Sequence, residues 1–371
     1  MNTTDPTRLR RPSTLVVRSG RMGDFLVAVP ALAALRRLRP EHRIVLLTGI
    51  SQDPKTVALA RRYSGAGLPP WVQWFEGRLF DAVIGFSRWN DPAEWRGLRA
   101  QLRAYWFRDA FILPYFSESR LRRWQKHLWL RSLGHWGKIH SRYNEAAAAR
   151  PSALSLQTWA ALDVVARGLG LPAVDLIRPA LDTGAPAQAF AAEFWRHPGL
   201  ATRTVVAMFP AGTFAHKRWP AERFAQVAGR ILATGAAVVF VGSEVDQAIV
   251  RETVRYLPAG PGVFDLTGRT TLAELAAVLG RCAAFVGNDG GPAHLAAAAG
   301  VPCVTIMSGV HCVGMWDPSG SAHVAVRYAT PCYDCRSEFD CPEGTRACVY
   351  GIGVEEVWQA CAPLLARRET V

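Results

Sequence analysis

The sequence predicts two α/β domains, each built around a doubly wound parallel sheet. The chain has 371 residues, and a single domain usually contains about 100–200. In both halves, short apolar runs bounded by turns alternate with stretches of helical periodicity, a pattern typical of buried parallel strands joined by helices. Between Leu171 and Pro198, four prolines and Gly184 interrupt this pattern, which favours a linker between the domains.

The first half begins with an apolar run at residues 14–17, which predicts a strand. A glycine-containing turn follows, and apolar residues at helical spacing then predict a helix over residues 26–38. Pro30 suits the first turn of that helix, because an N–H group there needs no partner within the helix. Two further buried strands are expected at residues 44–47 and 82–85.

The second half repeats the alternation, and we place the domain boundary so that the domains are residues 1–185 and 186–371. Strands are expected at residues 204–208, 236–241, 283–286 and 301–306. Helices are expected at residues 221–233, 272–279 and 292–299. In such sheets, ligands bind at the carboxyl ends of the strands.

Composition and segment length exclude several classes of protein. The longest apolar stretch, residues 295–310, is interrupted by glycine and proline and is shorter than the roughly 18 residues of a membrane-spanning helix. The N-terminal region lacks the apolar run of a secretory signal, so we expect a cytoplasmic protein whose eight cysteines are reduced. No nucleic-acid-binding signature is visible, so nucleic acid is not an expected partner.

The positive charge of the chain is concentrated in its first half. The net charge is +13, and residues 101–142 hold nine Lys or Arg against two acids. Within this segment, the sequence predicts a basic amphipathic helix that could lie on an anionic membrane surface. The residues expected to face the membrane or an acceptor are Arg120, Arg122, Arg123, Trp124 and Lys126. Alternatively, Leu121, Trp124 and Leu128 form the face of an ordinary helix that packs into the domain core.

Two strand-to-helix turns carry candidate functional residues. Asp24 ends the turn at residues 19–24, where it can act as a general base or cap the following helix. Thr213 and Lys217 lie in the loop at residues 210–220, where a hydroxyl and a positive charge suit a diphosphate. That loop could also be a solvated basic turn without a ligand.

Residues 287–294 form the sharpest local motif. Gly290 and Gly291 precede a proline at the start of a predicted helix, so their backbone amides could bind a pyrophosphate. Asp289 and His294 flank this position and could orient a hydroxyl-rich substrate. The alternative for His294 is a structural histidine without a ligand.

Four cysteines near the C-terminus could hold a structural metal. Cys332, Cys335, Cys341 and Cys348 lie within one loop-like segment, and four thiolates can bind zinc or iron. Their spacing does not form two C-x2-C pairs, so reduced, packed thiols are the alternative. Nothing in the segment indicates a catalytic nucleophile.

Three motifs in this order resemble glycosyltransferase family 9, the ADP-heptose:lipopolysaccharide heptosyltransferases. The motifs are Arg18-x4-Gly23-Asp24-x5-Pro30-Ala31-Leu32, Lys217-Arg218-Trp219-Pro220 and Asn288-Asp289-Gly290-Gly291-Pro292-Ala293-His294-Leu295-Ala296. They cover nearly the whole chain, and the cysteine-rich tail also resembles one seen in many members. Two features depart from the family pattern: Gly290 stands where many members carry Ser or Thr, and residues 71–142 are unusually rich in Trp and Arg.

The resemblance implies a GT-B architecture, with two Rossmann-like domains that face a central cleft. The N-terminal domain would bind the acceptor and the C-terminal domain the nucleotide sugar. Asp24 then matches the catalytic base, while Lys217 matches a position that is both catalytic and donor-binding. The remaining donor-binding positions would be Thr213, Glu244, Asp289, Gly290, Gly291 and His294, with Glu244 on the ribose.

The activity implied by the resemblance is transfer of a heptose from ADP-heptose to a hydroxyl group of a bacterial surface glycan, with inversion and without a catalytic metal. The acceptor would be a lipopolysaccharide-type phosphorylated glycolipid or another glycan, reached at the inner face of the cytoplasmic membrane. The alternatives are another nucleotide sugar, a protein or secondary-metabolite acceptor, and a sugar-binding or nucleotide-binding module without activity.

Overall fold

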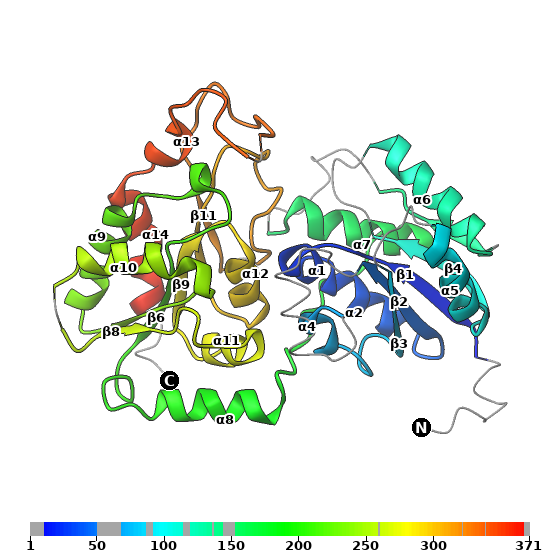
Figure 1. The fold of residues 1–371 in the computed structure, drawn as a ribbon, viewed down its shortest axis with the longest axis horizontal. Coiled ribbons are helices and arrows are strands. Elements are labelled where there is room, and N and C mark those ends of the chain that lie inside the picture. The colour runs from blue at the N-terminus through cyan, green and yellow to red at the C-terminus, as the bar shows by residue number, and fades with distance from the viewer. Residues whose placement is uncertain are drawn as a thin grey trace. The chain divides into compact units, whose positions relative to one another are not determined.

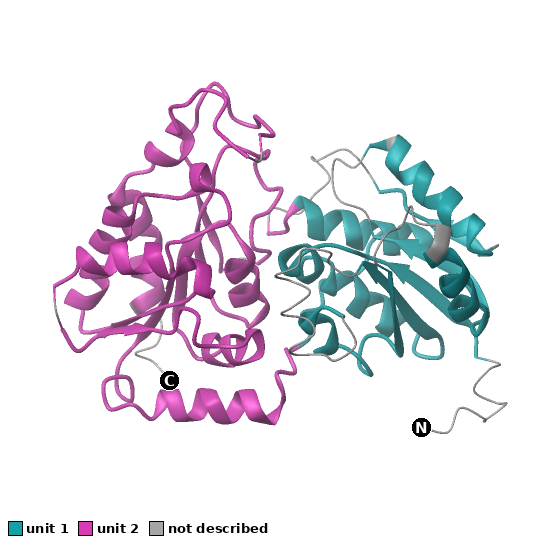
Figure 2. Ribbon diagram, viewed as in Figure 1, with its two compact units in different colours: residues 1–152, 156–179 teal, residues 153–155, 180–371 magenta. Residues whose placement is uncertain are grey.

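The computed structural model divides into two compact units, which Figure 2 shows in different colours. Unit 1 contains residues 1–152 and 156–179, and unit 2 contains residues 153–155 and 180–371. The structure describes residues 11–49, 68–86, 92–113, 119–135, 137–143, 153–258, 260–320, 322–337 and 339–366. Over these ranges, no helix is both long enough and apolar enough to cross a membrane.

Unit 1 contains a parallel sheet of five strands. In chain order these are β1 (Ser13–Val17), β2 (Arg43–Gly49), β3 (Ala82–Phe86), β4 (Phe107–Ile112) and β5 (Lys138–His140). Their order in space is β3-β2-β1-β4-β5 (Figure 1). All five residues of the central strand β1 are buried, as the apolar run predicts for a strand covered on both faces.

Helices cover both faces of this sheet. The helices of unit 1 are α1 (Met22–Leu26), α2 (Val29–Leu38), α4 (Pro70–Gln73), α5 (Pro92–Arg103), α6 (Arg120–Ser132) and α7 (Leu156–Gly168). On one face, α5 and α6 contribute Leu98 and Trp129 to a core with alternate strand residues such as Leu15. Helices α2 and α7 pack together, and Gly168 of α7 lies directly against Phe111 on the opposite face.

The predicted helix over residues 26–38 is divided in two by the structure. Helix α1 ends at Leu26 and α2 begins at Val29. Pro30 lies in the first turn of α2, as predicted, where its missing N–H is tolerated. The break leaves the glycine turn and α1 as a separate short element that carries Asp24.

Unit 2 contains a parallel sheet of six strands. In chain order these are β6 (Val205–Phe209), β7 (Ala237–Phe240), β8 (Val263–Asp265), β9 (Ala284–Asn288), β10 (Cys303–Ile306) and β11 (Val324–Val326). Their order in space is β11-β10-β9-β6-β7-β8 (Figure 1). The four strands predicted for this half correspond to β6, β7, β9 and β10.

The helices of unit 2 enclose a core centred on Trp219 and Phe224. The α-helices are α8 (Gly184–Trp195), α9 (Ala221–Ala233), α10 (Gln247–Arg255), α11 (Leu272–Leu279), α12 (Gly291–Ala298), α13 (Ala347–Tyr350) and α14 (Val354–Ala366), with short 3-10 helices η3 (Ala215–Lys217) and η4 (Glu244–Asp246). Residues of α9 and α14 share this core with β6, β7 and β9. The predicted helices at residues 221–233 and 272–279 are confirmed at the same bounds.

Helix α8 lies in the proline-rich stretch that the sequence interprets as a linker. Pro186 occupies its first turn, a position at which proline does not break a helix. The helix packs against α11 and buries Ala187, Ala191 and Trp195. The guanidinium of Arg281 lies 5.0 Å from the centroid of the Trp195 ring. The density of prolines therefore does not prevent an ordered helix at this position.

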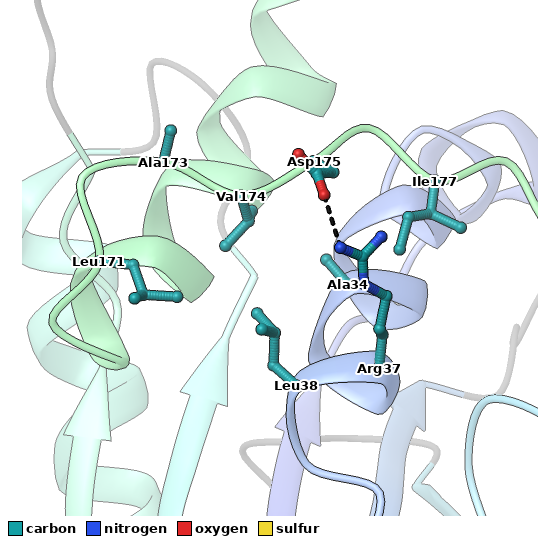
Figure 3. Close-up of a pocket in the computed structure, with 8 residues that line it drawn as sticks. All are labelled: Ala34, Arg37, Leu38, Leu171, Ala173, Val174, Asp175 and Ile177. Carbon is teal, nitrogen blue, oxygen red and sulfur yellow. Dashed lines mark hydrogen bonds and ion pairs between the residues drawn. The ribbon is translucent and has the colours of Figure 1, made fainter.

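A shallow pocket in unit 1 lies between α2 and the segment that follows α7 (Figure 3). Its lining is mostly apolar, with an exposed ion pair between Arg37 and Asp175 at its rim, 2.8 Å from Nη2 to Oδ2. Exposed pairs of this kind contribute at most about 1 kcal/mol. None of the predicted site residues lines this pocket.

Candidate functional site

In each unit, predicted site residues follow strands at the point where the strand order reverses. The chain of unit 1 runs from β1 outwards to β3 and returns to β4 on the other side of β1, while unit 2 repeats this path with β6, β8 and β9. Ligands of open α/β sheets bind outside the carboxyl ends of the strands at such points. Asp24 follows β1, Lys217 follows β6 and Asp289 follows β9, so each lies at the expected position within its own unit.

Asp24 caps helix α1 through one carboxylate oxygen. Its Oδ2 accepts a hydrogen bond from the backbone N–H of Arg21 at 2.7 Å. The side chain is half-buried, and Gly20 adopts a φ of +132° in the turn that leads to it. The capping interpretation is therefore geometrically correct, but it holds the carboxylate in place and does not exclude a role as a base.

The buried side chain of Arg18 fastens this turn. The residue is 2% exposed, and its Nε and Nη2 both donate to the backbone oxygen of Asp24, the first at 3.0 Å. Its Nη1 donates to the backbone oxygen of Leu113, just beyond β4, at 3.1 Å. Because a buried guanidinium needs such acceptors, Arg18 joins the ends of β1 and β4 to the turn that carries Asp24. Arg18 belongs to the first of the three motifs, but its bonds to distant backbone oxygens leave no pattern in the sequence.

The loop after β6 presents Thr213 and Lys217 differently. Thr213 is exposed, whereas Lys217 is half-buried in η3, with its Nζ 5.5 Å from the centroid of the Phe214 ring. The Nε of Arg218 donates to the backbone oxygen of Gly212 at 2.7 Å and so links the two ends of the loop. Lys217 thus lies on a short loop that the hydrogen bond between Arg218 and Gly212 stabilises.

Asn288, at the end of β9, joins this loop to the glycine motif. Its Nδ2 donates to the backbone oxygens of Pro210 and Ala211 at 2.8 and 3.0 Å. Its Oδ1 accepts from the backbone N–H of Trp219 at 3.1 Å. The residue is 1% exposed, so these bonds satisfy a buried amide. Asn288 therefore places Asp289 beside the loop that carries Lys217, a role that its position in the motif did not reveal.

The glycine motif begins helix α12, as predicted. Gly290 is the N-cap residue, and its oxygen accepts from the backbone N–H groups of Ala293 and His294 at 3.1 and 3.4 Å. The φ of Gly290 is 170°, and a Cβ there would lie 3.5 Å from the Phe209 ring. A side chain at this position would thus meet only ordinary contacts. The absence of Ser or Thr is therefore not enforced by the backbone.

Asp289 lies near charged and titratable side chains that the sequence only partly predicts. Burial raises the pKa of its carboxyl group above the ordinary value, while the positive charge of Lys217 acts in the opposite direction. His311, Asp317 and Arg327 also influence this carboxyl group. These three residues follow β10 or β11, and no sequence spacing indicated that they would lie near Asp289.

His294 and Glu244 differ in their surroundings. His294 is 7% exposed, and its ring centroid lies 6.1 Å from that of Trp316 in an edge-on contact. Glu244 is exposed at the start of η4, after β7. A Cβ on Gly268, where φ is +71°, would lie 3.0 Å from the Cα atom of Glu244. Glu244 thus lies where the loops after β7 and β8 meet, and its assignment to a ribose stays a prediction.

The outer face of α6 is apolar as well as basic. Leu121, Trp124 and Leu128 are 62%, 59% and 48% exposed, so they do not form the core-facing side of this helix. That side is formed by Trp129 and Leu130, which are buried.

The cations of α6 are placed differently from one another. Arg122 is exposed and Lys126 is half-buried. The guanidinium of Arg123 lies 5.3 Å from the centroid of the Tyr143 ring. The side chain of Arg120 lies outside what the structure describes. Arg122 and Lys126 are the two of the four predicted cations that we test as a pair below.

The four predicted cysteine ligands share one region of the structure. All are free and half-exposed. Burial raises the pKa of the Cys348 thiol, and the neighbouring Cys332, Cys341 and Cys335 add to this effect. Nevertheless, no three Cys, His, Asp or Glu side chains within the described ranges are arranged to hold a metal ion. A structural metal on these four cysteines therefore stays a prediction.

Residues 139–345 of the chain match glycosyltransferase family 9 (heptosyltransferase). The matched region begins in β5 and ends in the cysteine-rich segment. It includes the loop that contains Lys217 and the glycine motif. It does not include Asp24. The match thus covers more than half of the chain.

Curated relatives align over shorter regions. Lipooligosaccharide heptosyltransferase 2 of Haemophilus influenzae is 33% identical over 110 residues, which are 29% of this chain and 32% of the relative. Lipopolysaccharide heptosyltransferase 3 of Escherichia coli is 30% identical over 33% of this chain and 36% of the relative. The chain therefore spans about a third of the length of these relatives.

A solved structure is similar over nearly the full length. The family 9 glycosyltransferase from Veillonella parvula has a TM-score of 0.71 at 20% identity, covering 96% of this chain and 98% of that one. The ADP-heptose lipopolysaccharide heptosyltransferase II of Escherichia coli has a TM-score of 0.67 at 18% identity, covering 96% and 100%. These similarities confirm the predicted fold class, a GT-B fold with two Rossmann-like units.

Proposed function

Because the chain belongs to glycosyltransferase family 9, we propose that it transfers a heptose from ADP-heptose to a hydroxyl group of a lipopolysaccharide-type acceptor or another bacterial surface glycan. The observation that carries this proposal lies in unit 2, where the strand order reverses between β6 and β9. At this position, hydrogen bonds of the Asn288 side chain join the loop that contains Lys217 to the end of β9, which is followed by Asp289. A fixed cation beside a helix N-terminus is suited to a diphosphate.

In the proposed reaction, the nucleotide sugar binds to unit 2 and the acceptor to unit 1. Thr213, Lys217 and the backbone amides of Gly290 and Gly291 bind the diphosphate, Glu244 binds the ribose, and Asp289 with His294 binds sugar hydroxyls. The Asp24 carboxylate takes the proton of the acceptor hydroxyl as its oxygen attacks the anomeric carbon. The bond to the diphosphate breaks on the opposite side, so the anomeric configuration is inverted.

No metal takes part in this proposed mechanism. The charge that grows on the departing diphosphate is stabilised by the ammonium group of Lys217 and by the helix amides, which are already oriented before the reaction. The family 9 resemblance supports this assignment, and the charge of Lys217 acts on the carboxyl group of Asp289 at the end of β9. The cysteine segment is not required for any step.

The choice of donor is tested by calorimetry with ADP-heptose, ADP-glucose and a UDP- or GDP-sugar. We expect ADP-heptose to bind with the lowest Kd, because hydrogen bonds to a sugar hydroxyl can discriminate strongly between sugars. Release of ADP in the presence of a heptose-deficient glycolipid then measures transfer. Tighter binding of a UDP- or GDP-sugar would instead identify the enzyme as a family 9 glycosyltransferase with a different donor.

The acceptor is proposed to be reached at an anionic membrane surface through helix α6, at the inner face of the cytoplasmic membrane. In this proposal, the exposed Leu121, Trp124 and Leu128 enter the interface, while the positive charges of Arg122 and Lys126, on a different side of the helix, add attraction to the anionic headgroups. Helix α6 contains no acidic residue, so it presents no charge that would oppose an anionic bilayer. Exposed apolar side chains and positive charge on one helix are the combination that interfacial helices use.

We expect Arg122→Gln/Lys126→Gln to weaken binding to phosphatidylglycerol vesicles by about thirtyfold, because each cation near such a surface contributes about 1 kcal/mol. Co-sedimentation at low and high salt measures this, and salt should weaken the unmodified protein as well. The matched control is Arg251→Gln/Arg255→Gln, which removes two exposed cations from α10 of unit 2. Equal binding by both double variants would remove α6 from the proposal.

A further inference from the structure

The loop after β10 brings an aromatic side chain to the donor-site residues of unit 2. The Trp316 ring centroid lies 6.1 Å from that of His294 and 6.2 Å from that of His311, both in edge-on contacts. His294 belongs to the glycine motif, and His311 is one of the groups that act on the Asp289 carboxyl. Trp316 thus contacts two imidazoles, one from the glycine motif and one from its own loop.

This loop is braced from two sides. The backbone N–H groups of Asp334 and Cys335 donate to the backbone oxygen of Gly309 at 2.7 and 3.2 Å. That of Arg336 donates to the backbone oxygen of Val310 at 2.9 Å. The cysteine-rich segment therefore holds the beginning of the loop in place.

The end of the loop is held by an ion pair. Asp317, next to Trp316, pairs with Arg327, and the two side chains are 24% and 19% exposed. Arg327 follows β11, so the pair joins the loop to the edge of the sheet. A side chain held in this way loses little freedom when a ligand binds, which favours affinity.

The exposure of Trp316 distinguishes it from a core tryptophan. Trp219 in the same unit is 1% exposed, and its Nε1 donates to the backbone oxygen of Ile352 at 2.9 Å. Trp316 keeps partial exposure although it has two ring neighbours. A tryptophan that served only to fill the core would be expected to lie in surroundings like those of Trp219.

We infer that Trp316 is a specificity-determining residue that receives the sugar ring of the donor, with His311 as a hydrogen-bond partner for a sugar hydroxyl. A sugar ring presents C–H groups on its faces and hydroxyls at its edge, so a flat aromatic surface beside imidazole and carboxylate groups is complementary to it. This inference rests on the proposed function, because it assigns the sugar subsite of the same donor site. It adds residues after β10 that none of the sequence motifs contains.

The experiment compares the binding of ADP with that of ADP-heptose by calorimetry. For Trp316→Ala, we expect the Kd for ADP to stay within about twofold, whereas the Kd for ADP-heptose rises about five- to tenfold. Trp316→Phe should recover most of the affinity for ADP-heptose, since a ring is retained. The steady-state KM for the donor should follow the same order.

The matched control is Trp358→Ala. Trp358 is half-exposed in α14 of the same unit, and its ring centroid lies 5.9 Å from the guanidinium of Arg230. The Kd values of this variant therefore show the general effect of removing a partly buried tryptophan from unit 2. Equal losses for ADP and ADP-heptose in Trp316→Ala, or no loss for either, would overturn the inference. If the unmodified protein binds neither ADP nor any nucleotide sugar, the proposed function fails together with it, which is a separate and recognisable result.

Discussion

Replacement of Asp24 by Asn is expected to lower kcat by about 10²–10⁴-fold, because general-base catalysis contributes an effect of this size. The amide oxygen of Asn can still accept the hydrogen bond that Arg21 donates to Asp24. The cap of α1 is thus retained while the basic oxygen is lost. Donor affinity should change little, so the effect should appear in kcat and not in the Kd for the nucleotide sugar.

The matched control for this prediction is Glu274→Gln. The Glu274 carboxylate accepts from the backbone N–H of Thr271 at 2.7 Å at the start of α11, so it caps a helix as Asp24 does but lies outside the candidate site. We expect this variant to keep its turnover within about twofold, with only a small loss of stability. If Asp24→Asn retains turnover similar to that of Glu274→Gln, Asp24 is a helix cap and not the base.

Replacement of Lys217 by Gln is expected to lower kcat by about 10²–10³-fold, the usual cost of removing one group that stabilises developing negative charge. Gln is similar in length but carries no positive charge, so the diphosphate loses its cation as it departs. The Kd for ADP should rise as well, since the ground state already carries negative charge. Single-turnover measurements with saturating donor separate the effect on chemistry from the effect on binding.

Lys138→Gln provides the control for the loss of a positive charge. Lys138 is exposed at the start of β5 in unit 1 and lies outside the candidate site, so its replacement should leave kcat and the Kd for ADP unchanged. A normal kcat in Lys217→Gln, with a raised Kd for ADP alone, would show that Lys217 only binds the donor. A normal value of both would remove it from the site.

The elements that were predicted well are those whose apolar pattern is local. Helix α9 begins and ends at the predicted residues, because its apolar spacing and the proline that precedes it are both visible in the sequence. The break between α1 and α2 was not predicted, since the apolar pattern continues through it. Helix α8 forms inside a proline-rich stretch because its buried face packs against α11, a contact between segments distant in the chain.

The residues of the candidate site also fall into two groups, those that local sequence patterns indicate and those that only the structure reveals. Asp24, Lys217 and Asp289 follow strands at turns that contain glycine or proline, so the sequence already offers them as candidates, and their roles stay predictions. Arg18 and Asn288 belong to the motifs, but their bonds to backbone oxygens that follow other strands give no signal in the sequence. His311, Trp316 and Arg327 follow other strands at irregular spacing, and only the parallel sheet brings them to one edge.

The sequence by itself determined the α/β class, the order of most strands along the chain, and the motifs of glycosyltransferase family 9. It could do so because burial of parallel strands and the turn after each strand impose local patterns of apolar residues, glycine and proline. Only the tertiary structure decided which face of α6 is exposed. It also decided that Trp316 lies beside His294. Such features depend on contacts between residues far apart in the chain, which local periodicity does not record.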